Sequence, residues 1–307
     1  MGSSRTVYDE LLIGAVDLHC HVDLEFSTTR FRKAMPEWEW LPRAEAAGMR
    51  AIVLKSHLWP SVSLTPFLEQ LYTGTVRVET SITLNPAVGG IDPFAVEAAV
   101  AMGAKAVFMP TWGSRNDHER GGFHKRLDAA FHHFDPARLS TLSVLDDAGA
   151  LTGNAQEVLR LALDNDVVLS TGHLAWQESL VLVREARRLG FERLVFGHPL
   201  SGSVGAPLEA IQEAAGLGAY IEVCWPTIAP GRRDPVEVVQ VIRDIGASRS
   251  VLTSDFFGGA ASSPSDLLRM MLGALYDAGL SQEEIALGAA KNPAALLGVA
   301  PPGAGPQ

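Results

Sequence analysis

The chain has 307 residues and a formal net charge of −10 at neutral pH, with no run of basic residues. Because this charge would repel a polyphosphate backbone, we expect no nucleic-acid partner. No apolar stretch approaches the roughly 20 residues that span a bilayer, and residues 1–6 contain no hydrophobic signal segment, so we also expect no membrane attachment.

The chain contains only two cysteines, Cys20 and Cys224. Two cysteines cannot build a disulfide framework or a cysteine zinc cluster, which agrees with a reducing compartment and predicts a cytoplasmic protein. Any metal ion would therefore be held by histidines and carboxylates.

Apolar, strand-like runs alternate with stretches of helical period. The runs cover residues 15–19, 51–55, 77–84, 105–109, 167–171, 193–197, 219–223 and 250–254. Amphipathic segments between them include residues 177–189, 208–217 and 235–245. Eight such units predict an α/β protein with a (β/α)8 TIM barrel, a fold that needs about 250 residues.

We expect one barrel domain over residues 1–300, followed by a disordered Pro- and Gly-rich tail at residues 301–307. Residues 141–153, with Asp147-Ala148-Gly149 near a turn, predict a small hairpin inserted before the fifth strand. The barrel should be distorted there.

The predicted strands end in metal-ligating residue types. The first ends in His19-Cys20-His21, and because strand side chains alternate, both histidines should point one way and Cys20 the other. The fifth, sixth and eighth strands end in His173, His198 and Asp255. Since the C-terminal strand ends of such a barrel meet at one face, we expect a site for zinc, or for manganese, with open coordination positions.

Each of these residues also has a structural explanation. His173 could be a core histidine, His198 could owe its place to the turn at Pro199, and Asp255 could cap the next turn. Four such coincidences, each at the matching end of a predicted strand, are less plausible than a metal site.

On these residues the chain resembles the amidohydrolase superfamily of metal-dependent hydrolases, and residues 291–298 are similar to its closing helix. The resemblance implies that His19, His21, His173 and Asp255 hold one metal ion. It also implies that His198 serves a second ion or the substrate.

The sequence departs from this pattern at the fourth strand, where many binuclear members carry a bridging carboxylated lysine or glutamate. Residues 106–112 contain neither, but Lys55 ends the second strand. Its neutral amine could take up carbon dioxide and bridge two ions as a carbamate. The alternative is a cation that binds a substrate carboxylate beside a single ion.

A bound divalent ion can lower the pKa of its water to about 7 and polarise a carbonyl. Asp255, by its similarity to the superfamily's eighth-strand aspartate, would take the proton from that water and pass it to the leaving group. His198 or His57 would steady the developing oxyanion.

Three tryptophans, Trp59, Trp112 and Trp225, follow predicted strands closely and could line a pocket for an aromatic or heterocyclic substrate. Packing of the loops against one another explains them equally well. Arg115 lies nearest a strand end in the loop after the fourth strand and could bind a substrate anion. The sequence allows a homo-oligomer but contains no interface signature.

The sequence therefore predicts a hydrolase that opens an amide, cyclic imide or lactone in a small cyclic or aromatic compound. A metal-dependent nonoxidative decarboxylase is the first alternative, because the resemblance includes such lyases. A noncatalytic metal-binding protein is the second, and it predicts a closed ligand shell.

Overall fold

The structure, a computed structural model, describes residues 5–22, 36–122, 135, 139, 141–256 and 262–299. The predicted tail at residues 301–307 lies outside the described residues. The single domain over residues 1–300 stays a prediction.

All strands of the described chain pair in parallel. They are β1 (Val16–His21), β2 (Ala51–Lys55), β3 (Arg77–Glu79), β4 (Ser81–Thr83), β5 (Ala106–Phe108), β6 (Val168–Ser170), β7 (Leu194–Phe196), β8 (Tyr220–Cys224) and β9 (Ser250–Thr253). Their order in space follows their order in the sequence. Each of the eight predicted runs contains strand residues, and the run over residues 77–84 is split into β3 and β4 at Thr80.

The ladders β1–β2–β3 and β4–β5–β6–β7–β8–β9 meet at two seams. At one, β3 leads into β4 across Thr80. At the other, Cys20 forms a parallel bridge with Phe256, and the His21 N–H donates to the Phe256 carbonyl at 3.0 Å. The strands therefore follow one another around a ring, as expected for the predicted (β/α)8 barrel.

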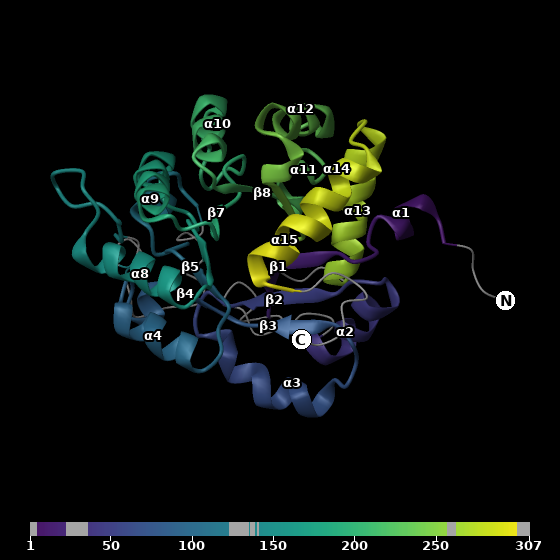
Figure 1. Cartoon of the computed structure of the whole chain (residues 1–307), viewed down its shortest axis with the longest axis horizontal. Coiled ribbons are helices and arrows are strands. Elements are labelled where there is room, and N and C mark those ends of the chain that lie inside the picture. Colours follow the sequence, from purple (N-terminus) through teal and green to yellow (C-terminus); the bar gives the residue numbers. More distant parts are fainter. Residues whose placement is uncertain are drawn as a thin grey trace.

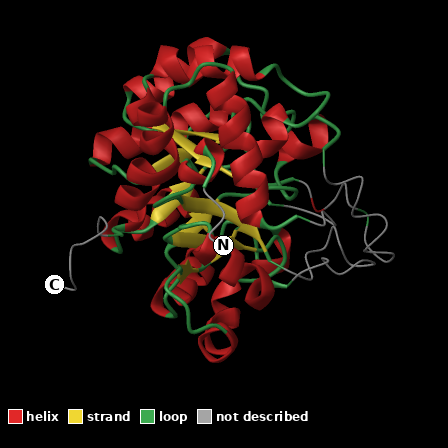
Figure 2. Cartoon of the chain, turned by 90° about the vertical axis from the view of Figure 1, so that its right-hand side faces the viewer, coloured by secondary structure: helices red, strands yellow, loops and turns green. Residues whose placement is uncertain are grey.

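Helices surround the strands on the outside (Figures 1 and 2). The described α-helices are α1 (Val7–Glu10), α2 (Glu37–Ala46), α3 (Thr65–Leu71), α4 (Pro93–Ala101), α5 (Arg115–Glu119), α8 (Gly153–Asp164), α9 (Trp176–Leu189), α10 (Leu208–Gly216), α11 (Trp225–Ile228), α12 (Pro235–Ile245), α13 (Pro264–Asp277), α14 (Gln282–Ala286) and α15 (Asn292–Leu297). Shorter helical turns are η2 (Ser61–Leu64), η3 (Pro86–Val88), η4 (Ala247–Arg249) and the π-helical η5 (Leu287–Lys291).

Helix ends follow the expected local chemistry. α12 begins at Pro235 behind an Asp234 cap that accepts the Val236 N–H, and it buries Val238, Val239 and Ile242 on one face. α9 ends at Leu189 and is capped by Gly190, whose φ of 73° suits glycine. The three helices expected at residues 177–189, 208–217 and 235–245 are confirmed as α9, α10 and α12.

The predicted hairpin is present in a reduced form. Leu145 and Leu151 form one antiparallel bridge, and the Asp146 N–H donates to the Ala150 carbonyl at 2.9 Å. The segment is an insertion between α5 and α8, and its single bridge is not part of the barrel sheet.

The apolar core has two layers separated by the strands. The outer layer packs the outward strand side chains, such as Ile52 and Leu252, against the helices. The inner layer fills the barrel with side chains at alternate strand positions and with residues of α15: Val16, Leu18, Ala51, Val53, Ala106, Phe108, Val168, Val195, Val251, Ala294, Leu296 and Leu297. These layers hold the strand ends in fixed positions.

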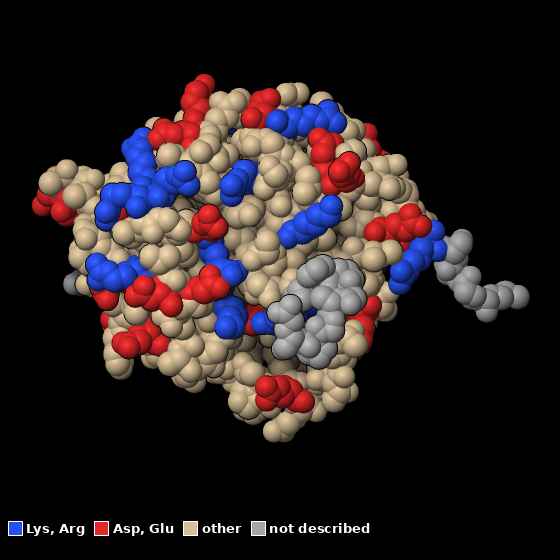
Figure 3. Space-filling view, viewed as in Figure 1, with Lys and Arg blue, Asp and Glu red and all other residues tan. Residues whose placement is uncertain are grey.

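Figure 3 shows Lys and Arg side chains interspersed with Asp and Glu on one face of the molecule. Some of them form ion pairs, such as Arg184 with Glu213 at 2.6 Å. Among the helices that the structure describes, none is long and apolar enough to cross a membrane.

Candidate metal centre

The two histidines of β1 point the same way, as the alternation of strand side chains predicts. Their Nε2 atoms are 3.2 Å apart, and both side chains are 2 % exposed. Cys20 lies in the outer core layer, with its Sγ 3.5 Å from the Ser254 Oγ. The prediction that Cys20 faces away is confirmed.

A bulge in β1 brings His19 to the inside of the barrel. The register with β2 shifts between the pairs Asp17–Ile52 and Cys20–Leu54. Leu18 belongs to the inner core layer, so strict alternation would turn His19 outward. The extra residue resets the alternation, and the side chains of His19 and His21 therefore both point into the mouth of the barrel, its open C-terminal end, above Leu18.

Asp255 and Lys55 meet these histidines. The Asp255 Oδ1 is 3.2 Å from the His19 Nε2 and 3.3 Å from the His21 Nε2. The Lys55 Nζ is 2.8 Å from the His19 Nε2, and Lys55 is 1 % exposed. Candidate ligand atoms of His19, His198 and Asp255 all lie within 4.8 Å of one another. The predicted residues of the first, second, sixth and eighth strands thus converge.

His173 also lies at this end of the barrel, where its ring centroid is 5.0 Å from that of His198. Gly172 has a φ of 59°, and a Cβ there would collide with the Met109 carbonyl oxygen, so the turn before His173 requires glycine. The His173 Nδ1 is 2.9 Å from the Asp117 Oδ1, and Asp117 is fully buried.

Three of these histidines form a hydrogen bond through Nδ1 to another side chain of the protein. His19 Nδ1 is 2.8 Å from the Glu222 Oε1, His173 Nδ1 contacts Asp117, and His198 Nδ1 is 3.1 Å from the Ser201 Oγ. Such partners fix the orientation of an imidazole and leave its Nε2 available to a metal ion. The donor set, imidazole nitrogens with one carboxylate, fits zinc or a similar divalent ion.

Two buried carboxylates that were not predicted from the sequence, Glu222 and Asp117, contact candidate ligands. Glu222 is 3 % exposed at an inward position of β8, in the segment Tyr220-Ile-Glu-Val-Cys224. A carboxylate in the middle of an otherwise apolar strand was a signal that could have identified it. Asp117 lies on the short helix α5 and had no comparable signal.

Burial and neighbouring charges shift the pKa of two of these groups. Burial lowers the pKa of His198 to about 3, so its imidazole is neutral at pH 7, as a metal ligand must be. Burial alone would raise the pKa of Glu222, but its interactions with His19, His198 and Thr253 outweigh burial and hold that pKa well below its usual range.

Two of the candidate ligands have left-handed backbone conformations that are uncommon outside glycine. His198 has a φ of 26° and Asp255 a φ of 42°. Such residues concentrate at functional sites, where surrounding contacts hold them. At Asp255, the preceding Ser254 N–H donates to both Asp17 oxygens at 3.2 Å, and the Phe256 N–H donates to the Ser254 Oγ at 3.1 Å.

The residues predicted to bind substrate lie at different depths. His57 is buried, and its ring stacks on that of His21 at 4.5 Å between centroids. Trp112 is 1 % exposed, Trp59 is half-buried against the outer core, and Arg115 is exposed. His57 therefore contacts a candidate ligand directly, through its ring stacking on His21.

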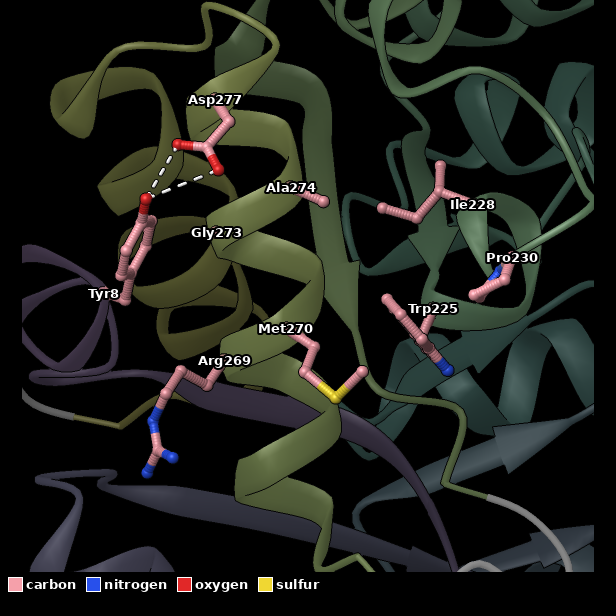
Figure 4. A pocket seen from close by; sticks show the side chains of 9 residues that line it. All are labelled: Tyr8, Trp225, Ile228, Pro230, Arg269, Met270, Gly273, Ala274 and Asp277. Atoms are coloured by element: carbon pink, nitrogen blue, oxygen red, sulfur yellow. Dashed lines mark hydrogen bonds between the residues drawn. The ribbon is translucent and has the colours of Figure 1, made fainter.

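Trp225 lines a separate groove of about 510 Å³ on the outer surface (Figure 4). Its lining also includes Ile228 of α11, Tyr8 of α1 and residues of α13, and the Tyr8 hydroxyl donates to Asp277 of α13 at 3.1 Å. None of the candidate metal ligands lines this groove. The role of Trp225 in binding substrate stays a prediction.

The parallel barrel, with histidines and an aspartate at its strand ends, has the fold of amidohydrolase-superfamily structures. An amidohydrolase from Pseudomonas aeruginosa aligns over 95 % of this chain and 98 % of its own, with a TM-score of 0.59 and 11 % identity. The probable dipeptidase PvdM from the same organism aligns over 95 % and 96 %, with a TM-score of 0.64 and 14 % identity. The 2,6-dihydroxybenzoate decarboxylase from Rhizobium aligns over 94 % and 99 %, with a TM-score of 0.52 and 12 % identity.

The chain belongs to a family described as a family of unknown function (DUF6282), whose model matches residues 14–222. No curated protein matches the chain by sequence. The predicted resemblance to the amidohydrolase superfamily is confirmed at the level of the fold.

Proposed function

We propose that the protein is a metal-dependent hydrolase whose ion is held by His19, His21, His173 and Asp255, with His198 serving a second ion or the substrate. One observation carries the proposal: the Nε2 atoms of His19 and His21 and the Oδ1 of Asp255 lie 3.2 to 3.3 Å apart. Two imidazole nitrogens and one carboxylate oxygen this close together are a donor set that suits zinc or a similar divalent ion.

When bound, a zinc or manganese ion would lower the pKa of a water molecule to about 7 and polarise a substrate carbonyl. Asp255 is the group that transfers the proton. Its side chain is 17 % exposed, against 2 % for His19 and His21, so it can reach both a water molecule and a substrate in the mouth. The carboxylate accepts the proton of the attacking water and returns it to the leaving group. His198 or His57 donates to the developing oxyanion.

Lys55 decides between one ion and two. Its Nζ is 2.8 Å from the His19 Nε2 and 4.6 Å from the centroid of the Phe108 ring, which places an amine among the candidate ligands. The neutral amine nitrogen would attack the carbon of carbon dioxide and lose an N–H proton to solvent, and the resulting carbamate would supply oxygen ligands for a second ion. Otherwise the ammonium binds a substrate carboxylate.

Metal content separates these two roles. Two equivalents of metal and an intact mass higher by one carbon dioxide, both lost in Lys55→Met, support the bridge. One equivalent with an unmodified Lys55 overturns it and assigns Lys55 to the substrate.

The substrate class we propose is a small cyclic or aromatic compound with an amide, cyclic imide or lactone bond. The name of the probable dipeptidase that shares the fold agrees with amide hydrolysis. The decarboxylase that shares the fold favours a second candidate, a nonoxidative decarboxylase in which Arg115 binds the substrate acid. A noncatalytic metal-binding protein would need a closed ligand shell, which the partly exposed Asp255 does not favour.

The experiment is metal analysis of the purified protein joined to a screen of lactones, cyclic imides, N-acyl amino acids and aromatic acids. Hydrolysis of one class, reduced at least 100-fold in Asp255→Asn, supports the hydrolase. Release of carbon dioxide without consumption of water identifies the decarboxylase. Full activity in Asp255→Asn overturns the proposed role of Asp255.

A further inference from the structure

We infer that Glu222 is a positioning residue that fixes the proton of His19 on Nδ1 and holds three ligand-bearing segments of the barrel together. The inference rests on the proposed function, because it concerns the same site. Glu222 would not touch the substrate or the ion in this role. It would act through His19, His198 and the end of β9.

Both carboxylate oxygens of Glu222 are used, and each bond leads to a different segment. Oε1 is 2.8 Å from the His19 Nδ1 on β1 and accepts the Thr253 hydroxyl of β9 at 2.8 Å. Oε2 accepts the backbone N–H of His198, which follows β7 after Gly197, at 3.1 Å. The side chain is 3 % exposed, so water does not compete for these bonds.

The hydrogen bonds around Glu222 decide which nitrogen of His19 carries the proton. The Glu222 oxygens accept the Thr253 hydroxyl and the His198 N–H, and a carboxylate oxygen that faces the His19 Nδ1 takes its proton as an acceptor, so Nδ1 is the donor. The lone pair of neutral His19 is then on Nε2, the atom that faces His21, Lys55 and Asp255. Only that tautomer can offer Nε2 to an ion.

A glutamine at this position cannot satisfy the same three donors. If its NH2 group takes the place of Oε2, it faces the His198 N–H, donor against donor. If the NH2 group takes the place of Oε1, it faces the His19 Nδ1, which must then accept, and the His19 proton moves to Nε2. The first orientation loses the hydrogen bond from the His198 N–H, and the second removes the lone pair from the His19 Nε2.

The bond to His198 also supports an unusual backbone conformation. His198 has a φ of 26°, and its N–H is directed at the Glu222 Oε2. Thr253 lies two residues before Asp255, whose φ is 42°. A single buried carboxylate thus contacts the chain at or near three candidate ligands, two of which have left-handed backbones.

The first test needs no variant. In metal-free protein at pH 7, long-range ¹H–¹⁵N NMR spectra should show His19 protonated on Nδ1. A His19 protonated on Nε2 alone overturns the inference. This measurement does not depend on metal binding or on activity.

The second test compares Glu222→Gln with Glu178→Gln, a buried carboxylate on α9 that bonds to Ser143 and to the Ala175 N–H, away from the ligands. Glu222→Gln should bind zinc about 10- to 100-fold more weakly in competition with a chromophoric chelator. It should also change the visible spectrum of the cobalt-loaded protein, and Glu222→Asp should restore part of the affinity. Glu178→Gln should bind zinc as the wild type does.

The outcomes separate this inference from the proposed function. Zinc binding that is equal in the wild type and Glu222→Gln, with the same cobalt spectrum, overturns the positioning role and leaves the proposed function intact. A wild type that binds no divalent ion overturns the proposed function, whereas the His19 tautomer still tests the role of Glu222. If Glu222→Gln does not fold, the wild-type tautomer remains the deciding measurement.

Discussion

The two halves of the barrel interior differ sharply, although the same strands build both. Toward the N-terminal strand ends the interior is filled by apolar side chains such as Val16, Ala51 and Val251, covered by Leu296 of α15. Toward the C-terminal ends the same strands present His19, Lys55 and Asp255. On each strand, the apolar residues of the core and the polar residues of the candidate site lie only a few positions apart. In this fold, changes in the packed half should affect stability, and changes in the polar half should affect chemistry.

The strongest test of this division lies within β1, where neighbouring residues belong to the two sides of the strand. We expect the double variant His19→Asn/His21→Asn to lose its bound metal. Because a catalytic ion contributes several kcal/mol to transition-state stabilisation, activity should fall on the order of 10³-fold or more. Metal analysis and turnover on the screened substrate measure both effects.

Cys20→Ala is the matched control, because Cys20 lies between the histidines but packs in the outer core layer. This variant should lower the melting temperature and keep the metal and most of the activity. If Cys20→Ala lost the metal and the double variant kept it, the division of β1 into two sides would be wrong.

Strand positions and most of the candidate ligands could be predicted because they leave local signals. An apolar run that ends in a polar residue identifies a strand end, and the barrel brings the strand ends together. His19, His173 and Asp255 therefore could be placed near one another without a structure.

Other features depend on contacts between distant segments, which no local pattern encodes. Asp117 contacts His173 because α5 lies beside the end of β6. Glu222 contacts His19 and Thr253 because β8 passes close to both β1 and β9. The bulge at His19 is visible only from the register with β2. The break at Thr80 also interrupts a run whose composition is continuously strand-like.

A substitution in the packed half should have the next largest effect, on stability alone. Leu296 is 2 % exposed and lies in the inner core layer, so Leu296→Ala should leave a cavity that costs about 2 to 5 kcal/mol. Activity per folded molecule should be unchanged, because Leu296 belongs to the inner apolar layer, which contains none of the candidate ligands. Denaturant unfolding and turnover at a temperature well below the transition measure the two effects.

Leu208→Ala serves as the comparison, since Leu208 is 36 % exposed at the start of α10. Its free energy of unfolding should change by no more than about 0.5 kcal/mol. An equal loss in both variants would show that packing inside the barrel contributes nothing special to stability. Loss of metal in Leu296→Ala would show that the packed half also shapes the site.

The smallest expected effect concerns Asp266, a polar residue that follows Asp255 closely in the sequence but stabilises a helix rather than the candidate site. Asp266 completes a capping box at the start of α13, where its Oδ2 accepts the Ser263 hydroxyl at 2.7 Å and the Ser263 N–H at 3.1 Å. Burial raises the pKa of Asp266, but these bonds and the charges of Arg269 and Arg43 outweigh burial and lower that pKa below its ordinary value of 3.8. Asp266→Asn should therefore cost about 0.5 to 1 kcal/mol at pH 7 and leave activity unchanged.

The pH dependence of that cost follows from the direction of the shift. A carboxyl whose pKa is lower in the folded state stabilises the protein above the unfolded pKa, and the contribution disappears as the pH falls through the folded pKa. The difference between the wild type and Asp266→Asn should thus be constant from pH 7 to about 5 and should shrink toward pH 3. Asp244→Asn, which removes an exposed carboxylate from the last turn of α12, should show no such loss. A difference that persisted unchanged at low pH would mean that Asp266 acts through packing rather than through its charge.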